Sequence, residues 1–328
     1  MKTVVNRVRQ ECSLLVKETG KVYWTLIKVM VPALLIVKVL DMLGGTLILA
    51  QVLSPLMQLM GLPDSMGLVW ATTLLTNMYT GMLVFFNLSL QEPLTVAQVS
   101  VLGTLMLLGH ALPVEGAVAK TIGVNWRATL TIRLGGALLL GSSLNLVYSH
   151  LGILQTPSTM LWHPESTLDT SFAAWAVSQL QTLLMIFPII LSLLGLLRIL
   201  RLLGIERVIH FMLFPVLRIL GIGKAAANVT IIGTVLGLSF GAGLLIREAR
   251  SGHISQRDIF LTLGFLGLCH SIIEDTMLVM LMGADLSGAL WARLVFAVVF
   301  IGVMARLAFV KNKSTELPAG LAENQPST

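Results

Sequence analysis

The sequence is poor in charged residues and in cysteine. Charged side chains make up 12% of its 328 residues and hydrophobic side chains 55%, whereas about a quarter of the residues in a soluble domain are charged. Two cysteines, Cys12 and Cys269, are too few for a disulfide framework or a zinc-finger motif. Because the deficit of charge extends along the whole chain, the composition predicts an all-α polytopic membrane protein.

Sequence signatures of catalysis are also missing. The chain contains no phosphate-binding loop, no Gly-x-Ser-x-Gly elbow and no dinucleotide fingerprint, so we expect neither an enzyme nor a bound cofactor. The net charge of +6 comes from Lys and Arg in short loops beside apolar runs, where they set membrane topology. It therefore does not indicate a nucleic-acid partner.

Apolar runs of about 18 to 25 residues recur along the chain, and this length crosses a bilayer. The lipid bilayer is thus the first expected partner. Residues 1–21 are charged and lack the apolar core and cleavage site of a signal peptide, so they predict a cytoplasmic amphipathic lead-in. The polar, proline-containing residues 311–328 predict a disordered cytoplasmic tail.

The two halves of the chain match at an offset of 160 positions, without a gap. Weak internal symmetry of this kind is typical of transporter folds. We therefore define a first repeat at 22–149 and a second at 172–310, joined by an external connection at 150–171. The matched positions include residue types that are rare here: His110 with His270, Glu115 with Asp275, Arg133 with Arg293, Pro55 with Pro215, Gly61 with Gly221, Gly81 with Gly241 and Gly123 with Gly283.

The distribution of Lys and Arg predicts that the repeats cross the membrane in opposite directions. Segments 42–65 and 150–171 contain no Lys or Arg and are predicted outside, whereas 198–224 contains five and is predicted inside. The first repeat then runs from inside to outside, and the second from outside to inside. This predicts an inverted repeat in the cell inner membrane, with both termini cytoplasmic.

Segments 66–88 and 226–248 satisfy the charge rule only if each one returns to its own side of the membrane as a re-entrant hairpin. Their middles, Thr76–Gly81 and Gly237–Gly243, are unusually polar or rich in glycine. A kinked full span remains the alternative for each segment. The polar side chains that we expect to contact a solute at these tips are Thr76, Asn77, Tyr79, Thr80, Thr234 and Ser239.

A long apolar stretch with an interruption follows each hairpin. Segment 96–124 is broken at Gly109–Pro113, and segment 256–284 at Cys269–Ser271. A final span then closes each repeat, at 128–149 and 288–309. The expected fold has about six transmembrane helices, two re-entrant hairpins and two interfacial helices.

Ionisable residues at membrane depth are rare and indicate function. The breaks are followed by such a set, which we expect to bind solute: His110, Glu115, His270, Ser271, Glu274 and Asp275. We expect structural ion pairs of Arg133 with Glu115 and of Arg293 with Asp275. Imidazole titrates near neutral pH, so either histidine could also relay protons. Two histidines and several carboxylates could instead ligate a divalent cation, but no His-x-x-x-His or Glu-x-x-His spacing occurs, and we expect no metal.

Four stretches carry a resemblance to a known family: Gly109–Glu115, Gly241–Arg247, Ile254–Asp258 and Gly267–Asp275. They resemble the nucleoside recognition or Gate domain family, which includes spore maturation proteins A and B. The chain is also similar to the transport core of concentrative nucleoside transporters and to the membrane part of ferrous iron transporter B. It lacks the polar Gln-Thr-Glu-like hairpin tip of the former and the soluble GTPase domain of the latter.

Together, these patterns predict a secondary transporter of a small polar, nucleoside-like solute, coupled to H⁺ or Na⁺. Its site would lie near the bilayer midplane, between two hairpins and two broken helices. Two alternatives remain: a membrane scaffold or partner protein of the spore-maturation type, and a divalent metal permease. The resemblance also implies a homo-oligomer or a complex with a second Gate-family protein.

Overall fold

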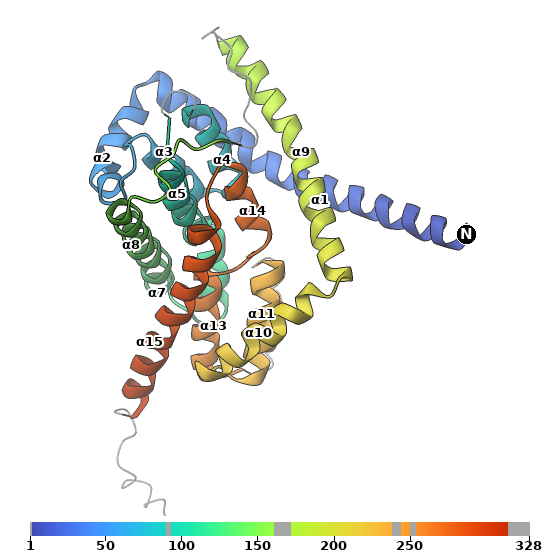
Figure 1. Ribbon diagram of the computed structural model, residues 1–328. Coiled ribbons are helices and arrows are strands. Elements are labelled where there is room, and N and C mark those ends of the chain that lie inside the picture. The colour runs from blue at the N-terminus through green and yellow to red at the C-terminus, as the bar shows by residue number, and fades with distance from the viewer. Residues whose placement is uncertain (1, 90–92, 161–171, 238–243, 250–253, 314–328) are drawn as a thin grey trace, which may run out of the picture.

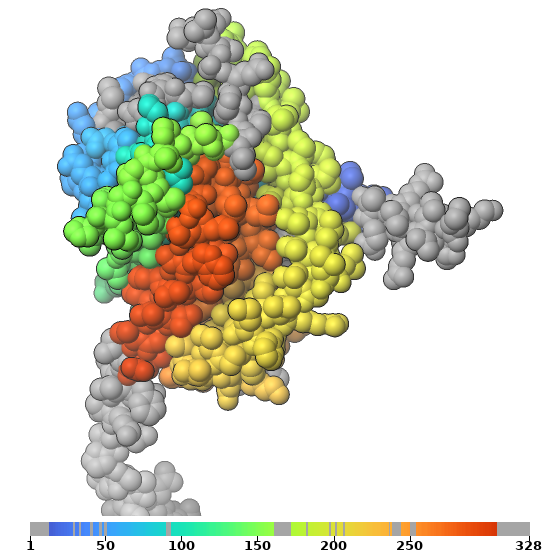
Figure 2. All heavy atoms as spheres, viewed as in Figure 1, coloured from blue at the N-terminus to red at the C-terminus, as the bar shows by residue number. Residues whose placement is uncertain are grey.

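The computed structural model describes residues 2–89, 93–160, 172–237, 244–249 and 254–313, and these residues form helices joined by short loops (Figure 1). The all-α prediction is therefore confirmed. Most of the second hairpin tip, including Ser239, lies outside the described residues, as do residues 161–171 of the connection and 314–328 of the tail. Figure 2 shows the two halves on separate parts of one face, the first in blue to green and the second in yellow to red.

Helix boundaries repeat along the chain at the predicted offset. Helices α2 (Gly45–Leu59) and α10 (Ile205–Ile219) begin and end 160 positions apart, as do α5 (Val96–Leu108) and α13 (Gln256–Leu268). The two halves therefore share the positions of these helices and of the turns beside them. Glycines with positive φ form pairs at the same offset: Gly44 with Gly204, Gly61 with Gly221 and Gly123 with Gly283.

The predicted lead-in continues into the first apolar segment without a break, because α1 (Lys2–Met42) is one continuous helix. Residues 1–21 contain many good helix formers and no proline, so nothing stops the helix before the apolar part. Helix α1 crosses α9 (Phe172–Leu202) in Figure 1. The Tyr23 hydroxyl donates a hydrogen bond to the carbonyl of Leu183 across this contact.

The first predicted hairpin is confirmed as two short helices, α3 (Met66–Leu75) and α4 (Met78–Ser89). They are about 15 and 18 Å long, each too short to cross a hydrocarbon core of about 30 Å. The chain folds back between them so closely that a Cβ on Gly81 would lie 1.8 Å from Thr73 Oγ1. Beyond the hairpin, Gln98 Nε2 donates to the carbonyl of Gly61 at 2.9 Å, so the chain leaves the hairpin beside the point where it entered.

The second hairpin segment begins with α11 (Lys224–Leu236). Its entry and exit are also neighbours, since Arg257 donates to the carbonyl of Gly221 at 2.9 Å. The carboxylate of Asp258 accepts a hydrogen bond from the backbone N–H of Gly223 nearby. These contacts repeat the arrangement at the first hairpin.

Both broken stretches are present. Helix α5 is followed by α6 (Leu112–Thr121), and α13 by α14 (Glu274–Leu281). Helix α6 begins two residues earlier than the offset predicts from α14, and it carries Pro113 in its first turn, where proline favours a helix start.

Each repeat closes with a helix that contains a π-helical turn. The first runs through α7 (Trp126–Leu130), η1 (Thr131–Gly135) and α8 (Gly136–Leu151), and the second through η2 (Ser287–Ala292) and α15 (Arg293–Lys313). Within the described residues, five helical segments are long and apolar enough to cross a membrane: Ser13–Val39, Val96–Thr121, Trp126–Leu151, Phe172–Leu200 and Ser287–Arg306.

The predicted sixth crossing, 256–284, is not among these segments, because its longer break divides it into two short helices. With five long apolar helices and several shorter ones, the chain has the architecture of a polytopic membrane protein.

Candidate functional site

The two helix breaks bring His110 and His270 into direct contact. Their Nε2 atoms lie 3.0 Å apart, and both side chains are buried, with 6% and 2% of their surface exposed. At each break the backbone takes a left-handed turn at the residue after the histidine, with φ of 47° at Ala111 and 45° at Ser271. The offset predicted that the two histidines correspond, but not that they touch.

Each imidazole is held by its own helix. His110 Nδ1 lies 3.0 Å from the carbonyl oxygen of Met106, and His270 Nδ1 lies 2.6 Å from that of Leu266. A carbonyl oxygen can only accept a hydrogen bond, so Nδ1 carries a proton in both rings. The two Nε2 atoms are therefore the ones left to face each other.

Two carboxylates approach this pair. Glu115 Oε1 lies 3.4 Å from His110 Nε2 and 3.5 Å from His270 Nε2. Asp275 Oδ2 lies 3.9 Å from His110 Nε2 and is buried without a hydrogen-bond partner among the described residues. His110, His270, Glu115 and Asp275 thus form one buried cluster, which we call the histidine cluster.

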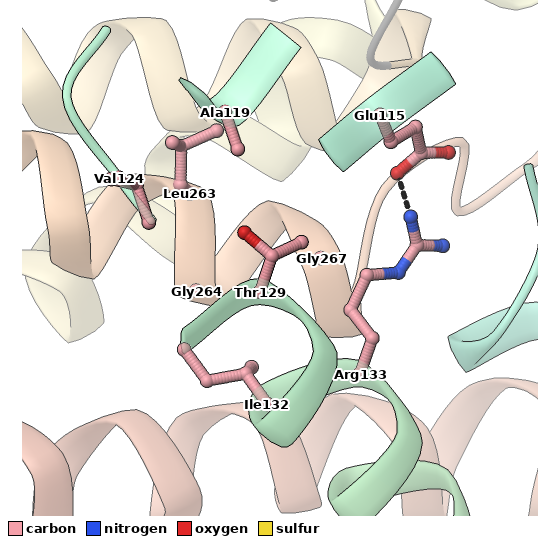
Figure 3. Close-up of a pocket in the computed structure, with 9 residues that line it drawn as sticks. All are labelled: Glu115, Ala119, Val124, Thr129, Ile132, Arg133, Leu263, Gly264 and Gly267. Carbon is pink, nitrogen blue, oxygen red and sulfur yellow. Dashed lines mark hydrogen bonds and ion pairs between the residues drawn. The ribbon is translucent and has the colours of Figure 1, made fainter. Parts of the chain in front are cut away.

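The arginines stabilise the breaks, but only one of them pairs as predicted. Arg133 forms the expected ion pair with Glu115 (Figure 3). Arg293 instead donates to the carbonyls of Leu268, at 2.9 Å, and His270, at 2.6 Å, and forms no ion pair with Asp275.

The physical reason for this correction is that a helix end leaves carbonyl groups without donors. At the end of α13, Arg293 supplies these donors. At the end of α5, Arg133 Nε likewise donates to Leu108 at 2.9 Å. The sequence could not show these partners, because they are backbone atoms.

The first hairpin touches the second break through a polar contact. The Tyr79 hydroxyl donates to Glu274 Oε1 at 2.9 Å, next to Asp275 in the chain. Asn77 and Thr76 do not join the cluster. Asn77 Oδ1 accepts from the backbone N–H of Thr80 at the start of α4, and the Thr76 hydroxyl bonds back to the carbonyl of Thr72.

The hairpins also contact the breaks through backbone hydrogen bonds. Ala111 N–H donates to the carbonyl of Thr73 at 3.1 Å, and Ile272 N–H donates to that of Thr234 at 2.9 Å. The Thr234 hydroxyl itself bonds to its own helix. Ser271 lies so close to the second hairpin that a Cβ on Gly237 would be 2.5 Å from its Oγ.

A small, mostly apolar pocket ends at the ion pair of Glu115 and Arg133 (Figure 3). Its volume of 20 Å³ has room for about one water molecule. Gly264 and Gly267 of α13 leave room in its wall because they have no side chains, and no sequence motif indicated that these two glycines line a pocket. The remaining lining residues are Ala119, Val124, Thr129, Ile132 and Leu263.

Comparison with known proteins supports the membrane assignment. The chain is similar to an uncharacterized membrane protein, YvoD of Bacillus subtilis (strain 168), with 27% identity over 288 residues, covering 86% of this chain and 90% of that protein. No family model matches the chain, and no solved structure matches it. It is therefore a multi-pass membrane protein, and the resemblance to the Gate family stays a prediction.

Proposed function

We propose that this membrane protein is a transporter of a small polar solute, and that the histidine cluster is its binding site. The observation that carries the proposal is the 3.0 Å contact between His110 and His270, which joins the two helix breaks inside the protein. Burying imidazoles, carboxylates and guanidiniums at membrane depth is costly, and proteins place such groups along solute and ion pathways. A scaffold would gain nothing from them.

The contacts between hairpins and breaks supply a route from binding to movement. Each break bonds to a hairpin through its backbone, at Thr73 and at Thr234, and Tyr79 bonds to Glu274. A hairpin that moves must therefore shift or release the break beside it. We propose that this coupling opens the cluster to one side of the membrane at a time, driven by H⁺ or Na⁺.

An inverted topology in the inner membrane, with cytoplasmic termini, is part of the proposal. This topology places three loops outside: the loop after the first hairpin, the connection between the repeats and the loop after α14. Contacts among these three loops support it. Leu94 accepts a hydrogen bond from the N–H of Ser158, whose hydroxyl donates to the carbonyl of Gly283. Cysteine labelling tests it: Thr159→Cys should react with an impermeant reagent from outside and Lys224→Cys only from inside. The reverse labelling pattern would contradict the inverted topology.

Uptake into proteoliposomes tests the function. Thermal-shift screening of the purified protein with nucleosides, nucleobases, amino acids, dicarboxylates and divalent metals identifies solutes to load, because a ligand of the folded state raises its stability. His110→Ala and His270→Ala should each abolish uptake while the protein stays folded. His210→Ala, which alters an exposed histidine of α10, is the matched control. Wild-type uptake by the double variant of His110 and His270 would instead favour the scaffold alternative.

A further inference from the structure

The geometry of the histidine cluster points to a specific occupant. We propose that His110 Nε2, His270 Nε2 and Glu115 Oε1 bind one divalent ion of a late first-row transition metal, and that this ion is the solute. The metal site is inferred from the geometry of the cluster alone. The statement that the ion is transported rests on the proposed function.

Three hydrogen-bond acceptors face one another in the histidine cluster. Both Nδ1 atoms donate to carbonyl groups, at 3.0 and 2.6 Å, so in neutral rings both Nε2 atoms carry lone pairs. These lone pairs point together across 3.0 Å, with a carboxylate oxygen 3.4 and 3.5 Å away. Within the described part of the chain no donor lies between them, so a positively charged centre is needed there.

The triangle that these three atoms form has the size of a metal site. With sides of 3.0, 3.4 and 3.5 Å, a point about 0.7 Å out of its plane lies about 2.05 Å from all three atoms, which is the usual metal–ligand distance for imidazole nitrogen and carboxylate oxygen. One ion can therefore bind all three groups with little movement. Two histidines and one glutamate with an open position form a known zinc ligand set.

The groups around these three atoms are also those expected around a metal site. Histidines that ligate metals donate their other ring N–H to a carbonyl or carboxylate, as both rings do here. The second oxygen of Glu115 is held by Arg133, which fixes the orientation of the first. Asp275 Oδ2 is buried, has no hydrogen-bond partner among the described residues and lies 3.9 Å from His110 Nε2, close enough to ligate the same ion directly or through water.

The donor set selects the metal class. Imidazole nitrogen favours Zn²⁺, Ni²⁺, Cu²⁺ and Fe²⁺, whereas Mg²⁺ and Ca²⁺ prefer sites made only of oxygen ligands. The ligands come from both repeats, since His110 and Glu115 follow one break and His270 the other. An ion at this point would therefore join the two halves and would be released when they separate.

The experiment is metal titration of the purified full-length chain after chelation, with Zn²⁺ and Co²⁺ as probes and Mg²⁺ as the comparison. We expect one Zn²⁺ or Co²⁺ per chain and at least 100-fold weaker binding in His110→Ala and in His270→Ala. Glu115→Gln, which removes one ligand charge, should bind more weakly than wild type but more tightly than either histidine variant, and His210→Ala should bind like wild type. The visible spectrum of bound Co²⁺ should show nitrogen ligands.

Binding of Mg²⁺ as tight as that of Zn²⁺, or Zn²⁺ binding that survives loss of both histidines, would overturn the site. Absence of Zn²⁺ and Co²⁺ binding would also overturn it and would leave a shared proton as the positive centre. If the histidine variants do not fold, the Co²⁺ spectrum of the wild-type protein decides instead. Metal binding without uptake would contradict the proposed transport function but not the metal site. Uptake of an organic solute without metal binding would contradict the metal site but not the transport function.

Discussion

The two helix breaks share a left-handed turn after the histidine but differ in how their carboxylates are held. Left-handed φ angles differ by 2° between Ala111 and Ser271, and each histidine bonds to the carbonyl four residues before it. In the first break Arg133 neutralises Glu115. In the second, Arg293 donates to backbone carbonyls, and one oxygen of Asp275 has no hydrogen-bond partner within the described part of the chain. The backbone turn is thus repeated in both breaks, whereas the partners of the two carboxylates differ.

This difference predicts the largest effect at Arg133. Arg133→Ala should destabilise the protein by about 3–5 kcal/mol, because it leaves the buried carboxylate of Glu115 uncompensated. The second substitution Glu115→Gln should restore much of this loss. Thermal unfolding of both variants in detergent measures the coupling, and a double variant no more stable than Arg133→Ala would show that the ion pair is not what holds the first break.

Arg293→Ala should cost about 1–3 kcal/mol for each of the two carbonyls that lose a donor and stay buried, which is less than the loss in Arg133→Ala, where a carbonyl donor at Leu108 is lost in addition to the ion pair. Here Asp275→Asn should give a smaller rescue than Glu115→Gln, because Arg293 donates to Leu268 and His270 and not to that carboxylate. The matched thermal unfolding experiment separates the two breaks. Rescue by Asp275→Asn equal to that by Glu115→Gln would mean that both arginines are ion-pair partners, as the sequence alone suggested.

Sequence patterns predicted what depends on residue type and spacing. The offset of 160 anticipated the helices Gly45–Leu59 and Ile205–Ile219, and the pairing of Arg133 with Glu115 followed from charge and depth. The hydrogen bonds of Arg293 could not be predicted from the sequence, because their acceptors are backbone oxygens, which every residue has. The sequence placed both histidines at one site between the two breaks but did not predict their contact, because correspondence between repeats does not give the distance between them.

Smaller changes in stability are expected from glycine substitutions at the left-handed turn that the two breaks share. A left-handed φ is unfavourable for residues with a Cβ, by about 1–2 kcal/mol, and glycine removes this strain while adding freedom to the unfolded chain. Ala111→Gly and Ser271→Gly should therefore change the free energy of unfolding by less than about 1 kcal/mol, and by similar amounts. Melting temperatures of the two variants compare them, and a loss at only one position would indicate that its side chain makes contacts that the other lacks.

The smallest effect is expected at the most visible sequence difference between the breaks, which is Pro113. It lies in the first turn of α6, where a proline gives up no helical hydrogen bond and only restricts the unfolded chain. Pro113→Ala should therefore lower stability by about 0.4–1 kcal/mol and leave Zn²⁺ binding unchanged. The left-handed turn at Ala111 orients His110, and the second break forms the same turn at Ser271 although it has no proline at the equivalent position. Thermal unfolding and zinc titration of this variant provide the measurement. A large loss of zinc affinity would mean that proline, and not the duplicated backbone turn, positions the first histidine.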